Sequence, residues 1–244
     1  MISPSPRSAI ERIIVALDVD SAKAAKEAVR TLSGRVGAFK IGFELFVSEG
    51  PSIVKMVQDE GGKVFLDLKF HDIPNTVAKA AKAAVRMGAA FFDVHASGGR
   101  AMMEKAAITA EEEAAVLGIS PPISLAVTVL TSLTADDLRD DLNIGKTPEE
   151  QVVSLALLAR ECGIRGVVSS PKEAAAIRAA VGRDFVIVTP GVRPAWAATD
   201  DQKRFTTPLE AVNAGADYLV IGRPILKAND PAEAAARIIE ELDV

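Results

Sequence analysis

Short runs of apolar and β-branched residues alternate with alanine-rich segments of helical period along most of the chain. A short apolar run bounded by turn residues is typical of a buried strand, whereas apolar positions three and four apart are typical of an amphipathic helix. The pattern predicts eight strands, at residues 13–19, 38–45, 63–70, 91–96, 124–130, 166–170, 185–190 and 218–225. The clearest predicted helices are 21–32, 75–88, 147–163 and 231–242.

The order of these elements predicts the fold. Strands that alternate with helices pair in parallel, and eight such units in 244 residues fit a closed barrel better than an open doubly wound sheet. No segment rich in Gly, Pro or Ser divides the chain. We therefore predict a single α/β domain, a (β/α)8 TIM barrel over residues 11–244, preceded by a loose extension at residues 1–10.

The composition narrows the classes of function. The net charge of −5 and the lack of a long basic stripe argue against a nucleic-acid groove, because such grooves depend on clustered Lys and Arg. The opening residues lack an apolar core of signal-peptide length and no window approaches a membrane span, so we expect a cytoplasmic protein with no membrane partner. Cys162 is the single cysteine and is predicted to be a buried free thiol.

Polar residues fall late in the predicted strands, which is where barrels of this type carry their active sites. They are Asp18, Lys40, Asp67, Lys69, Asp93, His95, Thr128, Thr131, Arg193 and Arg223. The first four belong to the first three predicted strands, so we expect them to converge at one end of the barrel.

The segment "DLKFHDIPNT" at residues 67–76 places a lysine between two acids. Asp67 and Lys69 are two apart and leave the same face of a strand. One interpretation of these charges is purely structural: an ion pair that ties a loop to the barrel. A metal site made by Asp67, Asp72, His71 and His95 is a second interpretation. Lys69 argues against it, because an ammonium would occupy the position where a divalent cation neutralises the acids; the two histidines are expected to be supporting residues.

Glycine turns give a second signal. "TPGVRP" at 189–194 and "IGRP" at 221–224 end the last two predicted strands, where barrels often bind phosphate through backbone N–H groups. Gly191 and Gly222 are also compatible with simple tight turns, but an arginine beside each, Arg193 and Arg223, favours phosphate. No GxGxxG or Walker pattern is present, so neither NAD nor ATP is indicated.

Seven segments carry a further signal: "ALD" at 16–18, "FKIG" at 39–42, "DLKFHDIPNT" at 67–76, "VHASGG" at 94–99, "VTVLTS" at 127–132, "VTPGVR" at 188–193 and "IGRPI" at 221–225. In this order, and across nearly the whole chain, they resemble the orotidine 5'-monophosphate decarboxylase family. The resemblance implies decarboxylation of orotidylate to uridylate, the last step of pyrimidine biosynthesis. It also implies that no metal or cofactor is used, and that the enzyme is a homodimer with shared active sites.

By position, the resemblance assigns Lys69 to protonate the ring carbon that loses carbon dioxide, and Asp67 to lie against the departing carboxylate. Asp72 is implied to complete the charge network from the partner subunit, and Lys40 to join that network to the ribose. The other implied substrate-binding residues are Asp18 and the partner chain's Thr76 for the ribose, Thr131 or the nearby Thr128 for the pyrimidine, and Arg193, Gln202, Gly222 and Arg223 for the phosphate.

The residue types agree with this chemistry. Loss of carbon dioxide leaves negative charge on a ring carbon with no cofactor to absorb it, and a fixed ammonium at Lys69 stabilises that charge. Two other classes of function stay open. One is a related barrel enzyme that acts on a sugar phosphate, as a decarboxylase or epimerase, through bound magnesium or zinc. The other is a non-catalytic nucleotide-binding module. The intact "KFHDIPNT" and the unbroken set of charges disfavour both.

Overall fold

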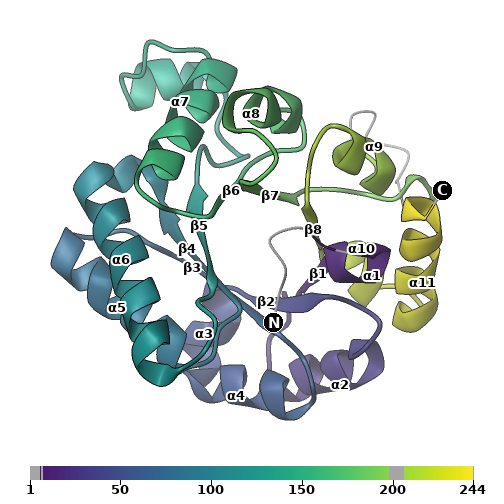
Figure 1. The fold of residues 1–244 in the computed structure, drawn as a ribbon. Helices are drawn as coiled ribbons and strands as arrows, with labels where there is room; N and C mark the ends of the chain where they lie inside the picture. Colours follow the sequence, from purple (N-terminus) through teal and green to yellow (C-terminus); the bar gives the residue numbers. More distant parts are fainter. Residues whose placement is uncertain (1–5, 7, 198–205, 244) are drawn as a thin grey trace.

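Eight parallel strands close into a barrel in their sequence order, with β1 paired to both β2 and β8 (Figure 1). The computed structural model describes residue 6 and residues 8–197 and 206–243. The strands are β1 (Ile13–Ala16), β2 (Ala38–Ile41), β3 (Val64–Phe70), β4 (Phe91–His95), β5 (Ile123–Val127), β6 (Gly166–Val168), β7 (Val186–Pro190) and β8 (Tyr218–Ile221). The predicted single-domain (β/α)8 barrel is confirmed.

Helices surround the barrel on its outer side (Figure 1). They are α1 (Ala9–Arg12), α2 (Ala22–Leu32), α3 (Phe43–Glu49), α4 (Ser52–Asp59), α5 (Pro74–Arg86), α6 (Arg100–Leu117), α7 (Pro148–Glu161), α8 (Ala174–Val181), α9 (Pro208–Asn213), α10 (Arg223–Leu226) and α11 (Pro231–Leu242). Their starts follow ordinary capping rules. Thr147 and Thr207 each form a capping box with a glutamate and precede a proline, which satisfies N–H groups that a helix start otherwise leaves unpaired.

Five predicted strands, the first, second, fifth, sixth and eighth, extend two or more residues past their observed ends, and the second and eighth run into helices. Residues 43–45 and 222–225 were expected to be extended, but β2 ends at Ile41 and β8 ends at Ile221, and α3 and α10 begin two residues later. Pro224 lies in the first turn of α10, where its fixed φ suits a helix and its lack of an N–H prevents strand pairing. Gly222 therefore caps α10, and residues 223–225 are helical rather than part of a strand.

Two apolar layers hold the barrel together. The outer layer lies between strands and helices, and the inner one fills the barrel itself. Inside, Phe91 packs against Phe65 at 5.7 Å and against Tyr218 at 5.2 Å between ring centroids. These rings, with the aliphatic residues of the inner layer, fill the interior below the polar groups described next.

Three further observations concern the remaining predictions. Ser8 caps α1, which packs against α11 and β8, while residues 1–5 and 7 of the predicted extension lie outside the described residues. Cys162 is buried at the end of α7 and is a free thiol, as predicted. Within the described ranges, no helix is both long enough and apolar enough to cross a bilayer.

Candidate active site

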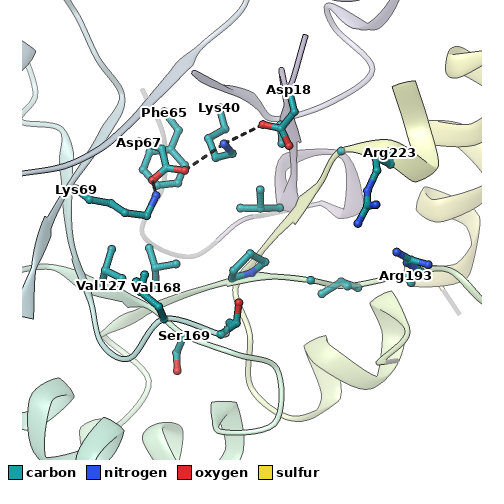
Figure 2. A pocket seen from close by; sticks show the side chains of 18 of the residues that line it. Asp18, Lys40, Phe65, Asp67, Lys69, Val127, Val168, Ser169, Arg193 and Arg223 are labelled. Atoms are coloured by element: carbon teal, nitrogen blue, oxygen red, sulfur yellow. Dashed lines mark hydrogen bonds and ion pairs between the residues drawn. The ribbon is translucent and has the colours of Figure 1, made fainter. Parts of the chain in front are cut away.

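A pocket of ≈ 420 Å³ opens at the carboxyl ends of the strands (Figure 2). This volume lies within the usual range for a small-molecule site. Charged side chains line one wall and one end of the pocket, and Val127 and Val168 lie across from Asp67 and Lys69 (Figure 2). The lining residues are Ala16, Asp18, Lys40, Phe65, Asp67, Lys69, Val127, Val129, Leu130, Thr131, Val168, Ser169, Pro190, Gly191, Val192, Arg193, Val220, Gly222, Arg223 and Pro224.

Four alternating charges run along one wall of the pocket, and we call Asp18, Lys40, Asp67 and Lys69 the charge chain (Figure 2). The Nζ of Lys40 lies 3.3 Å from Asp18 Oδ1 and 3.1 Å from Asp67 Oδ2. The Nζ of Lys69 donates to the other oxygen of Asp67. Each oxygen of the Asp67 carboxylate therefore faces one ammonium group. The sequence-predicted convergence of these four residues is confirmed.

Burial makes these interactions strong. The side chain of Asp67 is 11% exposed and that of Lys69 is 25% exposed. Burial alone would raise the pKa of Asp67, but the neighbouring Asp93 carboxyl group and the charges of the two lysines lower it to about 2. Burial alone would lower the pKa of Lys40, yet the carboxylates of Asp67 and Asp18 raise it above its ordinary value. Asp67 and Lys40 are therefore both charged at neutral pH.

The backbone of β3 is irregular where it carries these charges. Its pairing with β4 shifts register between Leu66 and Phe70, as in a β-bulge. Lys69 has φ 43°, in the left-handed region that non-glycine residues seldom adopt. Its ammonium also lies 5.8 Å from the ring centroid of Phe43, on α3. The sequence pattern predicted the shared face of Asp67 and Lys69, but neither this conformation nor the contact with Phe43.

Asp93 is a polar residue that the predicted site omitted, although it was noted as a polar residue late in its strand. It is fully buried on β4, and its Oδ1 accepts a hydrogen bond of 2.7 Å from the backbone N–H of Lys69. Burial and the charge of Asp67 raise its pKa well above the ordinary value, an effect that Lys69 opposes only in part. The alternation of side chains along β4, with Phe91 in the inner layer, indicates that Asp93 also faces the barrel interior.

Two arginines lie at the other end of the pocket from Lys69 (Figure 2). Neither Arg193 nor Arg223 forms an ion pair within the described part of the chain, so both guanidinium groups are available to a ligand anion. Gly191 beside them has φ 78°, which favours glycine. A Cβ at Gly222 would lie 3.3 Å from the Cβ of Ala16, so this turn and β1 approach closely.

The other sequence-predicted site residues are distributed differently. Thr131 lines the pocket, whereas Thr128 is buried and its hydroxyl donates to Val168 O at 3.2 Å. Asp72 and Thr76 are exposed and are absent from the described lining of the pocket. Asp72 Oδ1 instead accepts a hydrogen bond from the next backbone N–H, that of Ile73. Gln202 lies outside the described residues.

The histidines form a pair rather than part of the charge chain. The rings of His71 and His95 are 5.3 Å apart between centroids, and burial together with the neighbouring His71 lowers the pKa of His95. Across residues 8–197 and 206–243, no three His, Cys, Asp or Glu side chains are grouped so that they could hold a metal ion. The Asp67 carboxylate, the central ligand of the metal interpretation, is already paired with two ammonium groups.

Comparison with known proteins agrees with this geometry. Residues 11–238 match the sequence profile of the orotidine 5'-phosphate decarboxylase / HUMPS family. The chain is 54% identical over 234 residues to the orotidine 5'-phosphate decarboxylase of Syntrophomonas wolfei, covering 96% of this chain and 98% of the relative. It is 56% identical over 231 residues to that of Trichlorobacter lovleyi, covering 95% of each. The crystal structure of orotidine 5'-phosphate decarboxylase from Lactobacillus acidophilus superposes with a TM-score of 0.83 at 39% identity, covering 95% of this chain and 99% of that one.

The raised pKa of Asp93 predicts how stability changes with pH. An unfolded Asp loses its proton near pH ~3.9, whereas folded Asp93 keeps its proton to higher pH. Between those two values the folded state binds more protons, so wild-type stability falls as pH rises, by at most about 1.4 kcal/mol per pH unit. Asn titrates in neither state. Asp93→Asn should therefore gain stability relative to wild type from about pH 4 upward, measured by urea unfolding at several pH values.

Glu113 provides a control of opposite sign. It is a buried carboxylate bound by Arg86 and Lys82, whose hydrogen bonds lower its pKa. Its contribution to stability is present above the pKa of the unfolded chain and is lost as pH falls. Glu113→Gln should therefore show no relative gain as pH rises. A parallel response of the two variants would contradict the raised pKa of Asp93.

Proposed function

The chain belongs to the orotidine 5'-phosphate decarboxylase / HUMPS family and converts orotidine 5'-monophosphate to uridine 5'-monophosphate in pyrimidine biosynthesis, and we propose that the charge chain performs the chemistry. The observation that carries this proposal is the ammonium of Lys69. It is fixed by a buried carboxylate inside the pocket, at the opposite end from Arg193 and Arg223, which have no ion-pair partner among the residues that the structure describes.

Lys69 acts as the proton donor. When the bond between the ring carbon and the carboxylate breaks, carbon dioxide leaves and the bonding electron pair stays on the ring carbon. An ammonium held at that carbon stabilises the charge as it develops and then transfers its proton to the carbon. The products are uridine 5'-monophosphate and carbon dioxide, and the neutral amine regains a proton from solvent. No electron acceptor is required in this sequence.

Asp67 acts on the departing group. Its lowered pKa keeps it ionised, so a substrate carboxylate placed beside it is repelled until carbon dioxide leaves. Lys40 prevents Asp67 from relaxing away, because it binds the second carboxylate oxygen. The Lys40 ammonium also joins Asp67 to the more exposed Asp18. Asp18 and Lys40 together bind the ribose hydroxyls.

The arginine end of the pocket binds the phosphate. Arg193 and Arg223 supply the positive charge, and the turn at Gly222 brings backbone close to the ligand. Gln202 joins them in our proposal, while Thr131 contacts the pyrimidine. The phosphate is remote from the bond that breaks, so its binding energy is available to hold the substrate carboxylate against Asp67.

A homodimer completes each site. Asp72 and Thr76 are exposed beyond the described lining of their own pocket, which leaves them available to a neighbouring chain. Apolar residues are exposed nearby: Ile73, next to Asp72, is 67% exposed, and Phe43 on α3, whose ring lies 5.8 Å from the Lys69 ammonium, is 55% exposed. Large exposed apolar side chains of this kind mark association surfaces. We propose that two mouths face one another and exchange Asp72 and Thr76.

The alternatives are less well supported. A sugar-phosphate enzyme of a related barrel would need a metal ion, but lysines occupy both sides of the Asp67 carboxylate. A nucleotide-binding module would not need four alternating charges held in a pocket. The cytoplasmic location stays a prediction from the sequence.

Lys69→Ala should lower the turnover number for orotidine 5'-monophosphate by more than about a thousandfold, ~4 kcal/mol in the barrier, because the proton donor is lost. Circular dichroism should show an intact fold, and calorimetry should still detect binding of uridine 5'-monophosphate. The matched control is Lys55→Ala, which removes an exposed lysine paired with Asp59 on α4. A turnover number within about tenfold of wild type would exclude the role of Lys69.

The same assay in the presence of a chelator distinguishes the metal-dependent alternative. Since lysines supply the positive charge, turnover should be unchanged by chelation. Activity that is lost on chelation and restored by magnesium would favour the sugar-phosphate class instead.

Arg223→Ala should weaken binding of uridine 5'-monophosphate by roughly 10- to 100-fold, in line with the loss of a hydrogen bond to a charged group. Binding of uridine, which lacks the phosphate, should change little. Calorimetric titration of both ligands measures the difference. Arg183→Ala, at an exposed arginine that does not line this pocket, is the control. Equal weakening of both ligands would indicate a structural role for Arg223.

Subunit mixing tests the shared site. Homodimers of Lys69→Ala and of Asp72→Asn should both be nearly inactive. In a heterodimer, one site combines Lys69 of the second chain with Asp72 of the first and is fully wild type. Random exchange from an equal mixture should therefore restore activity to about a quarter of wild type per total site.

If Asp72 served its own chain, every site of the heterodimer would carry one lesion. Subunit exchange is verified independently with two affinity tags. No recovery of activity despite complete exchange would exclude the shared site.

A further inference from the structure

Asp93 is a fully buried carboxyl group to which the mechanism above gives no role. Its two oxygens have different surroundings. Oδ1 accepts the backbone N–H of Lys69 at 2.7 Å. Oδ2 is equally buried, but within the described structure no N–H or O–H group donates to it. A buried polar atom without a partner is costly and requires an explanation.

The carboxyl groups of Asp93 and Asp67 are close enough for each to shift the pKa of the other. Two carboxylates so close cannot both be ionised without strong repulsion. Asp67 is the one that keeps its charge, because two ammonium groups bind it. If Asp93 carries a proton on Oδ2, it donates to Asp67, and the unpartnered atom acquires a partner. The raised pKa of Asp93 and the lowered pKa of Asp67 agree with this arrangement.

The other oxygen, Oδ1, contacts the backbone of Lys69. Lys69 has φ 43°, a left-handed conformation that is strained for an L-residue. Such conformations persist only where surrounding contacts hold them, and they concentrate at functional sites. Because the ladder between β3 and β4 is interrupted between Leu66 and Phe70, the backbone N–H of Lys69 bonds to the Asp93 side chain instead. This bond therefore supports the backbone that directs the ammonium.

We propose that Asp93 is a positioning residue for the decarboxylation, a neutral carboxylic acid that holds the backbone of Lys69 with one oxygen and donates a hydrogen bond to Asp67 with the other. This inference rests on the proposed role of Lys69. Asp93 touches no substrate, since it does not line the described pocket. It fixes the proton donor and the ionised acid relative to one another. On β5, the residue paired with Asp93 is the apolar Leu125. The charged groups that act on Asp93 are Asp67 and Lys69 on β3.

Asparagine reproduces the shape and hydrogen bonding of a protonated aspartic acid. Its carbonyl oxygen accepts where Oδ1 accepts, and its amide group donates where the acid proton donates. Asparagine does not reproduce an ionised aspartate, because an ionised carboxylate donates no hydrogen bond to Asp67 and the amide group does. The pair of substitutions Asp93→Ala and Asp93→Asn therefore separates the two protonation states.

Asp93→Ala should lower kcat by about 100-fold, the loss expected when a catalytic group is misplaced by about 1 Å, while KM changes by less than about threefold. Asp93→Asn should recover most of that loss. Infrared difference spectra should show the carbonyl stretch of a protonated carboxylic acid in the wild-type enzyme at neutral pH, and this band should be missing from Asp93→Asn. Asp93→Ser provides a second variant with the same expected loss if Asp93→Ala does not fold.

Glu113→Ala is the matched control, because it removes another buried carboxyl group that lies between α5 and α6, away from the pocket. It should lower the unfolding midpoint without changing kcat. A kcat of folded Asp93→Ala or Asp93→Ser within about threefold of wild type would overturn the positioning role. An Asp93→Asn enzyme as impaired as Asp93→Ala, or no protonated-acid band in wild type, would overturn the neutral donor. If Lys69→Ala is active, the proposed role of Lys69 fails, whatever Asp93 does.

Discussion

The active site depends on one buried carboxylate, Asp67, held between two ammonium groups. Taking an isolated carboxylate out of water costs several kcal/mol, and the cost is offset only when its oxygens are paired with good geometry. Here each oxygen faces one lysine. The dependence is mutual, because each lysine is partly buried and is held in place by the same acid. Asp67, Lys40 and Lys69 therefore form a unit in which replacing any member removes a charge that another member faces.

The closed barrel explains how residues far apart in the sequence join this unit. Lys40 pairs in register with Ala16 of β1 on one side and Phe65 of β3 on the other, so its side chain lies between Asp18 and Asp67. Because β8 closes the barrel against β1, the turn at Gly222 comes close to the start of the charge chain. One pocket therefore spans from the proton donor to the phosphate-binding arginines.

Much of this arrangement follows from local sequence pattern. Alternating apolar runs and helical periods predict the eight strands, and polar residues late in those runs predict the charge chain. The ends of β2 and β8 were wrong because the apolar runs there continue into α3 and α10. The alternation of side chains along a strand indicates that Asp93 lies on the inner face of the barrel, but it does not predict the hydrogen-bond partners of Asp93. They depend on the interrupted register between β3 and β4 and on the left-handed backbone at Lys69, and both are set by contacts distant in sequence.

A neutral Asp93 also has a consequence for the charge balance of the pocket. Asp18 and Asp67 balance Lys40 and Lys69, so the charge chain has no net charge. An ionised Asp93 would add an unbalanced negative charge behind Asp67 and would compete with it for Lys69. Both effects would oppose an anionic substrate and weaken the contact that holds the proton donor. With Asp93 protonated, the repulsion acts only where Asp67 meets the substrate carboxylate, and departure of carbon dioxide relieves it. The remote arginines supply the attraction that brings the substrate in.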